Sequence, residues 1–438
     1  MLVALNSRVV RPEVVPTDGS SRFVIITMKY LQGTFVLALF LCVSVSPAAA
    51  DSPPVVTQEQ VRALALARSP LVKLIDAEYA VSVGSAMELA VLNNPSLSTE
   101  TQFSAHPRAS TGDNQIVASI DQPLRLSDFG SRSRVAALMN RTAQDDQKLA
   151  LLELTQRIHL LYVKLWSERE QLEQLDGVRR KASKKLTLAE SAASRGLVTS
   201  GEKQLIEGEV GRLKAQILGI RSVVAQTESE LLKISGCDLA RATLEPPELK
   251  APPALEALLK IGVETDLNPL QRARRAAELA REQVRLAELD RISTITPRVV
   301  YEHTNDGSDF FGVGITVPLA IWDRNQGQRV IAAARDDQRR AELDMLSAGA
   351  LEKHIEMLQR ASQTSYEQAQ VFKSQVLPSF RGALESQERE FQSGKGSILQ
   401  LWQSLRALSE AQEQELSLRV RSAEVLSQLS LFVGQEVQ

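Results

Sequence analysis

Apolar residues recur along the chain at alternating spacings of three and four, which is the pattern of a coiled-coil seam. The first such tract runs from Gly130 to Ser194, breaks at Arg195-Gly196, restarts near Gly201 and ends before Gly236. At 1.5 Å per residue, a first helix of about 65 residues would be about 95 Å long. We therefore predict a long antiparallel helical hairpin with its turn at Gly196.

A second tract has the same design further along the chain. Its apolar positions ascend from Leu351 to a break at Ser393–Gly396 and return from Leu401 to Phe432. Pro378 lies inside the ascending part, where its missing N–H should kink the helix. The sequence thus predicts two helical hairpins.

Two short segments alternate with period two, as strands with one apolar face do. The clearer one has apolar residues at Phe311, Val313, Ile315 and Val317, and the weaker one has them at Ile116, Ala118 and Ile120, although Val117 interrupts its polar side. We predict partner strands at Leu97–Ser104 and Arg298–Thr304, with Glu100 and Glu302 on equivalent faces.

The two halves align at an offset near 200 residues. Each half has a Pro-Leu pair at the end of a strand, and the matched segments are Ser69-Pro70-Leu71 with Asn268-Pro269-Leu270, Gln122-Pro123-Leu124 with Val317-Pro318-Leu319, and Gly196 with Gly394. We predict a tandem duplication, with a first repeat at 57–245, a Pro-rich linker at 246–254 and a second repeat at 255–434.

The four predicted strands approach the 9 to 11 residues with which a β-barrel wall crosses a membrane. Four strands cannot close a barrel, and open edges are not tolerated in lipid. If these strands span a membrane, several copies must therefore combine them into one sheet. A soluble four-stranded sheet beside a coiled coil remains the alternative on periodicity alone.

The N-terminus has the features of a secretory signal peptide. Met28-Lys29 precedes an apolar run and the small residues Ala48–Ala50, so we predict that residues 1–50 are removed and that Met28 is the natural start. Cys42 lies in this segment and follows Leu41, whereas lipoprotein processing favours a small residue before the cysteine.

Composition excludes several functional classes. The 51 basic and 53 acidic residues give a net charge of -2, which argues against a nucleic-acid binder. The four histidines are at least 51 residues apart in sequence, and Cys237 would be the lone thiol of the exported chain, so we expect no metal site and no cofactor. No P-loop, nucleophile elbow or HExxH motif indicates an enzyme.

Together, these features resemble the TolC family of outer-membrane efflux proteins. The sharpest match is Val317-Pro318-Leu319 followed by Ile321–Gly327, which is similar to the strand-to-helix junction of the CzcC-like branch, the heavy-metal efflux components. This second junction includes Pro318, Asp323, Asn325 and Gly327, and its first-half counterpart includes Pro123, Asp128 and Gly130. We expect the prolines to end the strands, the aspartates to cap the following helices, and all seven residues to be architectural.

The helical tips also resemble the family. Gly196 with Thr199 and Gly394 with Ser397 match its Gly-x-x-Ser/Thr turn, which the resemblance assigns to docking of the periplasmic adaptor. The family usually has an aspartate three residues beyond the hydroxyl, where this chain has Glu202 and Gln400.

The resemblance implies a mainly α-helical protein with a small β part that works as a homotrimer. Three protomers of four strands would form a 12-stranded barrel in the outer membrane of a Gram-negative bacterium, continued by a helical barrel through the periplasm. The partners it implies are a periplasmic adaptor (membrane fusion protein) and, indirectly, an inner-membrane RND transporter. The function would be a passive exit duct for metal ions or small toxic compounds.

A periplasmic coiled-coil adaptor or another structural protein of an export system is the alternative function. An adaptor normally carries one hairpin flanked by the halves of a β-rich lipoyl-like domain, whereas this chain has two hairpins in direct repeat. The sequence leaves the exported substrate open.

Overall fold

The computed structural model describes residues 55–102, 115–194, 199–291, 294–347, 349–393 and 395–436. These residues belong to one structural unit, Pro53–Gln438. The predicted signal peptide and the tip glycines Gly196 and Gly394 lie outside the described residues.

The chain is mainly helical, and similar elements follow one another in its two halves. The elements of the first half are β1 (Val55–Val56), α1 (Gln58–Arg68), α2 (Pro70–Ala90), β2 (Ser96–Gln102), β3 (Gln115–Asp121), α3 (Ser131–Ser194), α4 (Ser200–Ser235) and β4 (Thr243–Leu244). Those of the second half are α5 (Leu255–Glu264), α6 (Pro269–Leu289), β5 (Thr296–Thr304), β6 (Asp309–Thr316), α7 (Gln326–Ser347), α8 (Ala350–Val371), α9 (Leu377–Gln392) and α10 (Ile398–Val433).

The first hairpin agrees closely with its prediction. Helix α3 is a continuous helix of 64 residues, because its apolar seam persists without an internal glycine turn or proline. Helix α4 ends where Gly236 adopts φ 70°, a left-handed conformation that stops a helix at little cost for glycine.

Four strands form an antiparallel sheet in the order β2-β3-β5-β6. Glu100 lies opposite Val117, which lies opposite Glu302, so the two glutamates share one face as predicted. The other face is largely apolar. Six of its side chains are at least half exposed: Ile116, Ile120, Val299, Phe311, Val313 and Ile315. Ala118 and Tyr301 lie on the same face and are half-buried. No described element of the chain therefore covers the apolar face of the sheet.

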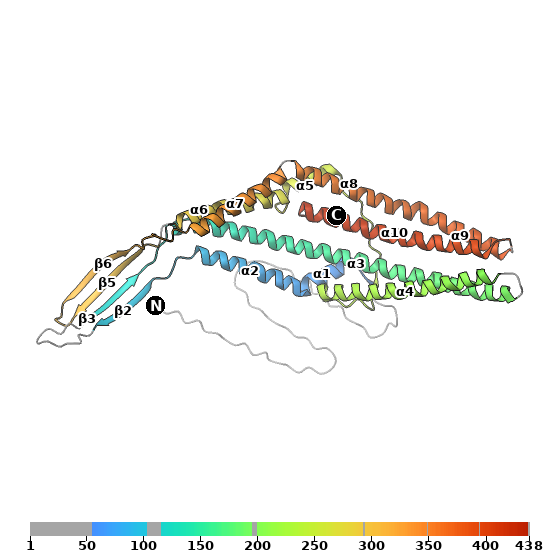
Figure 1. The fold of residues 1–438 in the computed structure, drawn as a ribbon, viewed down its shortest axis with the longest axis horizontal. Coiled ribbons are helices and arrows are strands. Elements are labelled where there is room, and N and C mark those ends of the chain that lie inside the picture. Colours follow the sequence, from blue (N-terminus) through green and yellow to red (C-terminus); the bar gives the residue numbers. More distant parts are fainter. Residues whose placement is uncertain are drawn as a thin grey trace, which may run out of the picture. The chain divides into compact units, whose positions relative to one another are not determined.

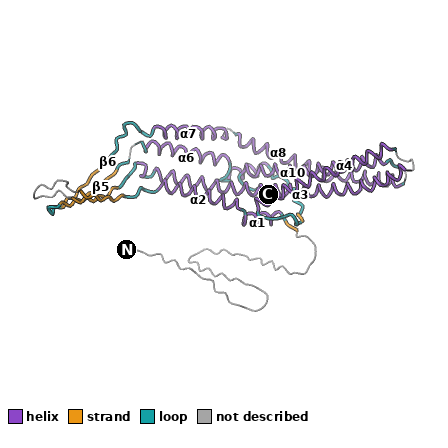
Figure 2. The backbone as a smooth tube through the Cα atoms, turned by 60° about the horizontal axis from the view of Figure 1, so that its bottom comes forward, coloured by secondary structure: helices purple, strands orange, loops and turns teal. Residues whose placement is uncertain are grey.

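Four helices continue from the sheet side by side. Their order is α2, α3, α6 and α7, as the helix contacts and both views of the backbone agree (Figures 1 and 2). Away from the sheet, α3 packs against α4 and α10, and α10 packs against α8 and α9 (Figure 1).

Three large apolar clusters and a small one at Ile206 and Ile398 hold the described helices together. One joins α1, α3 and α4 around Ile158 and Leu231, a second joins the two hairpins around Leu213 and Leu405, and a third joins α5, α8 and α10 around Leu258. Within the described ranges, none of the helices carries an apolar stretch long enough to span a bilayer.

The ascending helix of the second half is divided, unlike α3. Gly349, with φ 75°, separates α7 from α8, and a π-helical turn over Phe372–Val376 separates α8 from α9. Pro378 lies two residues after the end of this turn, and the turn accommodates a residue that lacks an N–H for the usual helical bond. The sequence predicted an irregularity here through Pro378 but not the π-helical form it takes.

Candidate functional site: strand–helix junctions and helical tips

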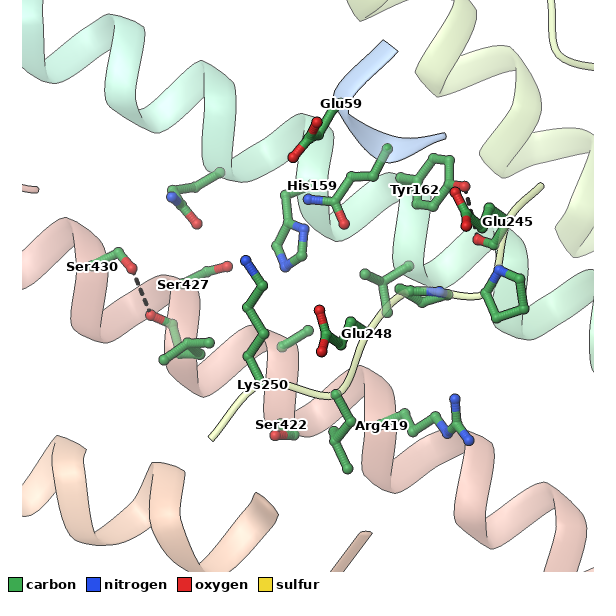
Figure 3. A pocket seen from close by; sticks show the side chains of 18 of the residues that line it. Glu59, His159, Tyr162, Glu245, Glu248, Lys250, Arg419, Ser422, Ser427 and Ser430 are labelled. Atoms are coloured by element: carbon green, nitrogen blue, oxygen red, sulfur yellow. Dashed lines mark hydrogen bonds between the residues drawn. The ribbon is translucent and has the colours of Figure 1, made fainter. Parts of the chain in front are cut away.

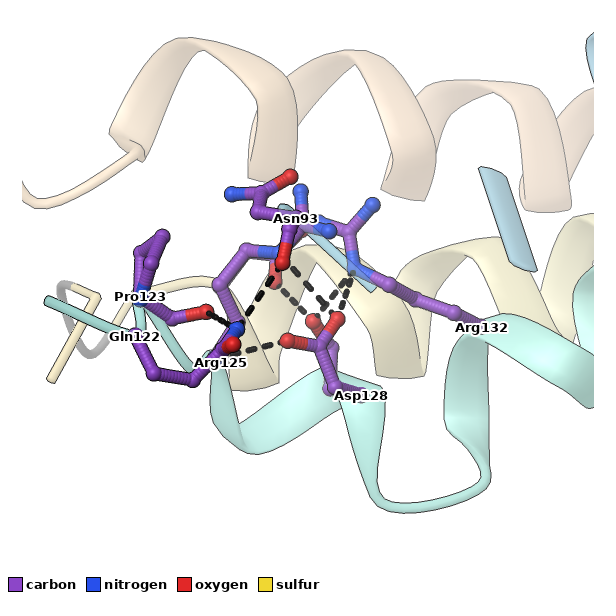
Figure 4. A network of polar contacts seen from close by, with 8 residues as sticks. Asn93, Gln122, Pro123, Arg125, Asp128 and Arg132 are labelled. Atoms are coloured by element: carbon purple, nitrogen blue, oxygen red, sulfur yellow. Dashed lines mark hydrogen bonds and ion pairs between the residues drawn. The ribbon is translucent and has the colours of Figure 1, made fainter. Parts of the chain in front are cut away.

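The junction between β3 and α3 is a closed network of charged groups (Figure 4). The Asp128 side chain is 2% exposed and forms ion pairs with the Nε atoms of Arg125 at 3.1 Å and Arg132 at 3.3 Å. Arg132 also reaches Asp290, just after α6, with 2.8 Å between Nη2 and Oδ2. Ser127 donates a hydrogen bond to the same aspartate. Side chains from both halves of the chain thus fix this junction.

Asp128 has a different role from the helix cap that we predicted. Its Oδ2 accepts a hydrogen bond from the backbone N–H of Arg125 at 2.8 Å, which closes a 3₁₀ turn over Leu126–Asp128 before α3 begins. Gly130 occupies the position whose carbonyl accepts the first helical bond, from Arg134. Asp128 therefore lies two residues too early in the chain to cap α3.

Strand β3 ends at Asp121, two residues before Pro123, although backbone bonds toward the β5 side continue past the proline. The backbone N–H groups of Gln122 and Leu124 both donate to the segment that leads into β5, at Pro297 and Ile295. Alternate residues of an antiparallel strand point their N–H groups to opposite neighbours, so residue 123 points its nitrogen toward β2. Ladder pairing on that side stops at Ser96, opposite Asp121, so no donor is needed at residue 123.

Gly130 and Asn325 occupy the same position in the two junctions, one residue before α3 and α7. Both have positive φ, 101° and 56°. Glycine adopts the φ of 101° freely because it has no Cβ, and asparagine tolerates the left-handed φ of 56°. The side-chain amide of Asn325 also donates a hydrogen bond to the carbonyl of Ala287 at 3.1 Å. Both residues thus shape the turn that leads into a long helix.

The second junction is open. Asp323 accepts a hydrogen bond from the N–H of Asn325 at 2.9 Å, so it shapes the turn before α7 and does not cap the helix. Leu319 and Trp322 are 80% and 86% exposed. Pro318 follows the last residues of β6, and Gly327 is the second residue of α7, with open space where a side chain would project.

Both helical tips begin with a capping box, in which an N-cap hydroxyl and a side chain three residues later bond each other's backbone N–H. At α4, Thr199 Oγ1 accepts from Glu202 N at 3.2 Å, and Glu202 Oε2 accepts from Thr199 N at 3.0 Å. The hydrogen bonds that the Glu202 carboxylate accepts from the backbone N–H and the hydroxyl of Thr199 hold the pKa of Glu202 below its usual value.

At α10, Ser397 and Gln400 form the same arrangement, with 3.5 Å between Ser397 N and Gln400 Oε1. Glu202 and Gln400 stand where the resemblance leads one to expect aspartate, and capping explains both. The patterns Thr-x-x-Glu and Ser-x-x-Gln are the signal from which the sequence could have predicted this.

The second tip also requires Gly396, the last residue of the predicted break at Ser393–Gly396. A Cβ at this position would lie 2.8 Å from Phe391 N and 3.0 Å from Glu390 C, closer than real Cβ contacts. The N–H groups of Lys395 and Gly396 both donate to the Glu390 carbonyl at 3.0 Å, which brings the chain against the end of α9.

A polar cavity of about 350 Å³ lies between α3, α10 and the segment that joins the two halves (Figure 3). His159, Glu248 and Lys250 point into it. Burial, and next the charge of Lys250, lower the pKa of His159 to about 4, so the ring is neutral at pH 7. The lining combines acidic and basic groups, so it favours neither an anionic nor a cationic ligand.

Tyr162 anchors the same region and was not among the predicted site residues. Its hydroxyl lies 2.9 Å from the Val56 carbonyl and 2.8 Å from the Glu245 carbonyl, which ties β1 and the start of the joining segment to α3. Burial raises its pKa to about 12. Among the described residues, no group of three or more His, Cys, Asp or Glu side chains could hold a metal ion.

No protein-family model matches the chain, and comparison with curated proteins finds no significant match. Solved structures do match it. The outer membrane protein VceC of Vibrio cholerae is 19% identical, with 87% of this chain and 97% of VceC covered and a TM-score of 0.68. The CmeC outer membrane channel of Campylobacter jejuni is 13% identical, with 87% and 86% covered and a TM-score of 0.71.

The MtrE outer membrane channel of Neisseria gonorrhoeae, solved in its open state, gives the same result. It is 15% identical, with 87% of this chain and 89% of MtrE covered and a TM-score of 0.66. The matches extend over the sheet and both helical hairpins, because they cover most of the described residues. The chain has the fold of these outer-membrane channels.

Proposed function

We propose that this protein is the outer-membrane exit duct of a tripartite RND-type efflux system, a member of the TolC family that acts as a passive conduit. The single observation that carries the proposal is the β2-β3-β5-β6 sheet, in which, among the described residues, one apolar face is uncovered and both edge strands are unpaired. Such a sheet is stable in a bilayer only when its edges are closed. The likeness in fold to outer-membrane channels supports the same conclusion.

The duct is a homotrimer in this proposal. Three copies give the 12 strands of a closed barrel. Helices α3, α4, α9 and α10 of the three copies together form a helical barrel through the periplasm. The apolar strand face contacts outer-membrane lipid. An adaptor alternative does not account for an amphipathic sheet with two open edges.

The two halves are tandem repeats at 57–245 and 255–434, joined by the linker 246–254. Matching elements support this: α2 and α6 have 21 residues each and begin at Pro70 and Pro269, and α4 and α10 have 36 residues each. Both long return helices end at glycines with positive φ, Gly236 and Gly434. Residues 1–50 are the signal peptide in this proposal.

The cargo is a metal ion or another small toxic compound, and the resemblance of the second junction to the CzcC-like branch supports the metal. Deleting the gene should then sensitise the host to particular divalent cations. Unchanged tolerance to a panel of cations, together with sensitivity to organic compounds, would assign the protein to drug export.

The decisive experiment is reconstitution of the purified, exported chain. We expect a heat-modifiable trimer in the outer-membrane fraction and single-channel conductance in planar bilayers. A protein that crosslinks only to monomers or dimers, or that fractionates with soluble periplasmic proteins, would overturn the proposal. Mass spectrometry of the same sample should place the mature N-terminus near Asp51.

Thr199 and Ser397, with Gly196 and Gly394, form the adaptor-docking tips in this proposal. Gly394→Trp should abolish efflux-dependent resistance while the trimer still reaches the membrane. Gly208→Trp is the matched control, because Gly208 is an exposed glycine of α4 with open space around it, away from the tip. Wild-type resistance in Gly394→Trp would move the docking surface elsewhere.

A further inference from the structure

The row of strands and helices in one protomer has two outer sides. Among the described residues, the elements on these sides have a packed neighbour on one side only. Strands β2 and β6 are the edges of the sheet, and α2 and α7 flank the row of four helices. Val135 in α3 is 1% exposed, whereas Val330, at the corresponding position of α7, is 69% exposed. Helix α3 has packed helices on both sides, α2 and α6, and α7 has α6 on one side. Within the described ranges, the outer face of α7 therefore has no packed neighbour.

Corresponding positions can be assigned from helix starts. Helices α2 and α6 both begin with a proline after a side-chain N-cap, Ser69 or Asn268, so position 76 corresponds to position 275. Helices α3 and α7 both begin one residue after a positive-φ residue, so position 145 corresponds to position 340.

Inside the protomer, α3 and α6 are joined by a salt bridge at these positions. Arg275 of α6 pairs with Asp145 of α3, and the two side chains are 16% and 8% exposed. Arg275 also pairs with Asp266 on its own segment at 2.6 Å, so one guanidinium connects two carboxylates.

At the two open surfaces, the same positions carry the opposite charges. Position 340 of α7 is an arginine, where α3 has Asp145, and position 76 of α2 is an aspartate, where α6 has Arg275. Arg340 is 52% exposed and pairs with Asp336 of its own helix. Asp76 is exposed and accepts a hydrogen bond from Gln147 at 2.8 Å through Oδ1.

We propose that α7 and β6 of one copy dock on α2 and β2 of a second copy in the geometry of the internal α3–α6 and β3–β5 contacts, with Arg340 pairing with the second copy's Asp76. The occupant is another copy of this chain because the surfaces are complementary in charge and each lacks the partner that its internal counterpart has. Arg340 then connects Asp336 and Asp76 as Arg275 connects Asp266 and Asp145. This inference rests on the proposed oligomeric duct and specifies its seam.

The register across the seam follows from a separate strand correspondence, in which Glu100 of β2 matches Glu302 of β5 and the 195-residue offset of α3 and α7 extends back into β3 and β6. Ile120 of β3 lies opposite Val299 of β5. Their counterparts are Ile315 of β6 and Leu97 of β2, both exposed apolar residues. We therefore expect Ile315 opposite Leu97 of the second copy, which places both side chains on the apolar face.

Charge reversal tests the helix pair in the full-length, membrane-assembled protein. Arg340→Asp and Asp76→Arg should each lower the temperature at which the detergent-solubilised oligomer dissociates by about 3–5 °C, because like charges then meet at the seam. The double variant restores opposite charges and should regain most of that loss. Single variants that act additively in the double variant would overturn the pairing.

Disulfide crosslinking tests the geometry independently, in a Cys237→Ser background. Asp76→Cys with Arg340→Cys, and Leu97→Cys with Ile315→Cys, should each give covalent oligomers after oxidation. Leu97→Cys with Val313→Cys, two residues out of register, and the internal pair Asp145→Cys with Arg275→Cys should not. If conducting oligomers form and neither designed pair links them, the seam is wrong but the proposed function stands. If no oligomer forms, the proposed function itself fails.

Discussion

The two strand–helix junctions have the same motif but opposite surroundings. In the first, Asp128 is almost fully buried and joins Arg125, Arg132 and Asp290 in one network. In the second, Asp323 bonds a neighbouring backbone N–H, and Trp322 beside it is 86% exposed.

The difference follows from where each junction lies in the row of elements. The first junction is flanked by elements of its own chain on both sides, so its polar groups find partners as the monomer folds. The second lies at the end of the row, beside edge strand β6 and helix α7. A motif that repeats in sequence thus becomes a folded core in one half and an exposed surface in the other.

The largest expected effect is a difference in stability loss between substitutions of the two junction aspartates. Asp128→Asn leaves two arginines near a buried, uncharged amide and should cost about 3 kcal/mol of stability. Asp323→Asn keeps an acceptor in an exposed turn and should stay within about 0.5 kcal/mol. Denaturant unfolding in detergent measures both. Equal losses of unfolding free energy in the two variants would mean that both junctions stabilise the fold to the same extent, which would contradict this comparison.

The cavity beside α3 should make stability depend on pH. His159 has a folded-state pKa of about 4 against an ordinary value of 6.5, so between these values the unfolded chain binds a proton that the folded chain does not. Stability is therefore complete above pH 6.5 and falls by up to about 3 kcal/mol as pH drops to 4.

Comparing melting temperatures at pH 7.5 and pH 5 tests this dependence on His159. His159→Gln, which does not titrate, should reduce the difference between the two temperatures. Lys250→Met should reduce it partly, because the charge of Lys250 is the second cause of the low pKa. If His159→Gln keeps the full difference, another group is responsible.

A smaller difference in stability is expected between substitutions at equivalent positions of α3 and α8. Tyr162→Phe removes the hydroxyl whose single proton the Val56 and Glu245 carbonyls share, and should cost about 2 kcal/mol, although the Val56 carbonyl still accepts from the Glu245 N–H. Met357 of α8 lies 195 residues further on, the offset of the junction motifs, and is 54% exposed, so Met357→Leu serves as the control and should be nearly neutral. Similar melting temperatures for both variants would contradict this assignment.

The smallest effects concern the tips. Thr199→Ala and Ser397→Ala should each cost about 1 kcal/mol of local helix stability, and the loss should be larger at Thr199, whose box has the shorter return bond and a carboxylate acceptor. Hydrogen exchange of the first-turn amides of α4 and α10 reports this directly. Faster exchange in Ser397→Ala than in Thr199→Ala would reverse the ranking.

Elements were predictable where local pattern dominates. The seam from Gly130 to Ser194 gave α3 almost to the residue, and the alternation around Phe311–Ile315 gave β6. The roles of the junction residues were less predictable. Asp128 was expected to cap a helix, but its bond runs back to Arg125 and its charge is met by Arg132, a pairing that depends on how the turn closes.

The sequence by itself determined the helices, the strands and their amphipathic faces, because heptad spacing, period-two alternation, capping hydroxyls and glycines act over a few neighbouring residues. Only the tertiary structure decided which copy of each motif is buried. Asp290 reaches Arg132 across 158 positions, and Asp145 meets Arg275 across 130. Such contacts depend on the order in which strands and helices pack, which fixes what surrounds each residue, and local pattern carries no information about that order.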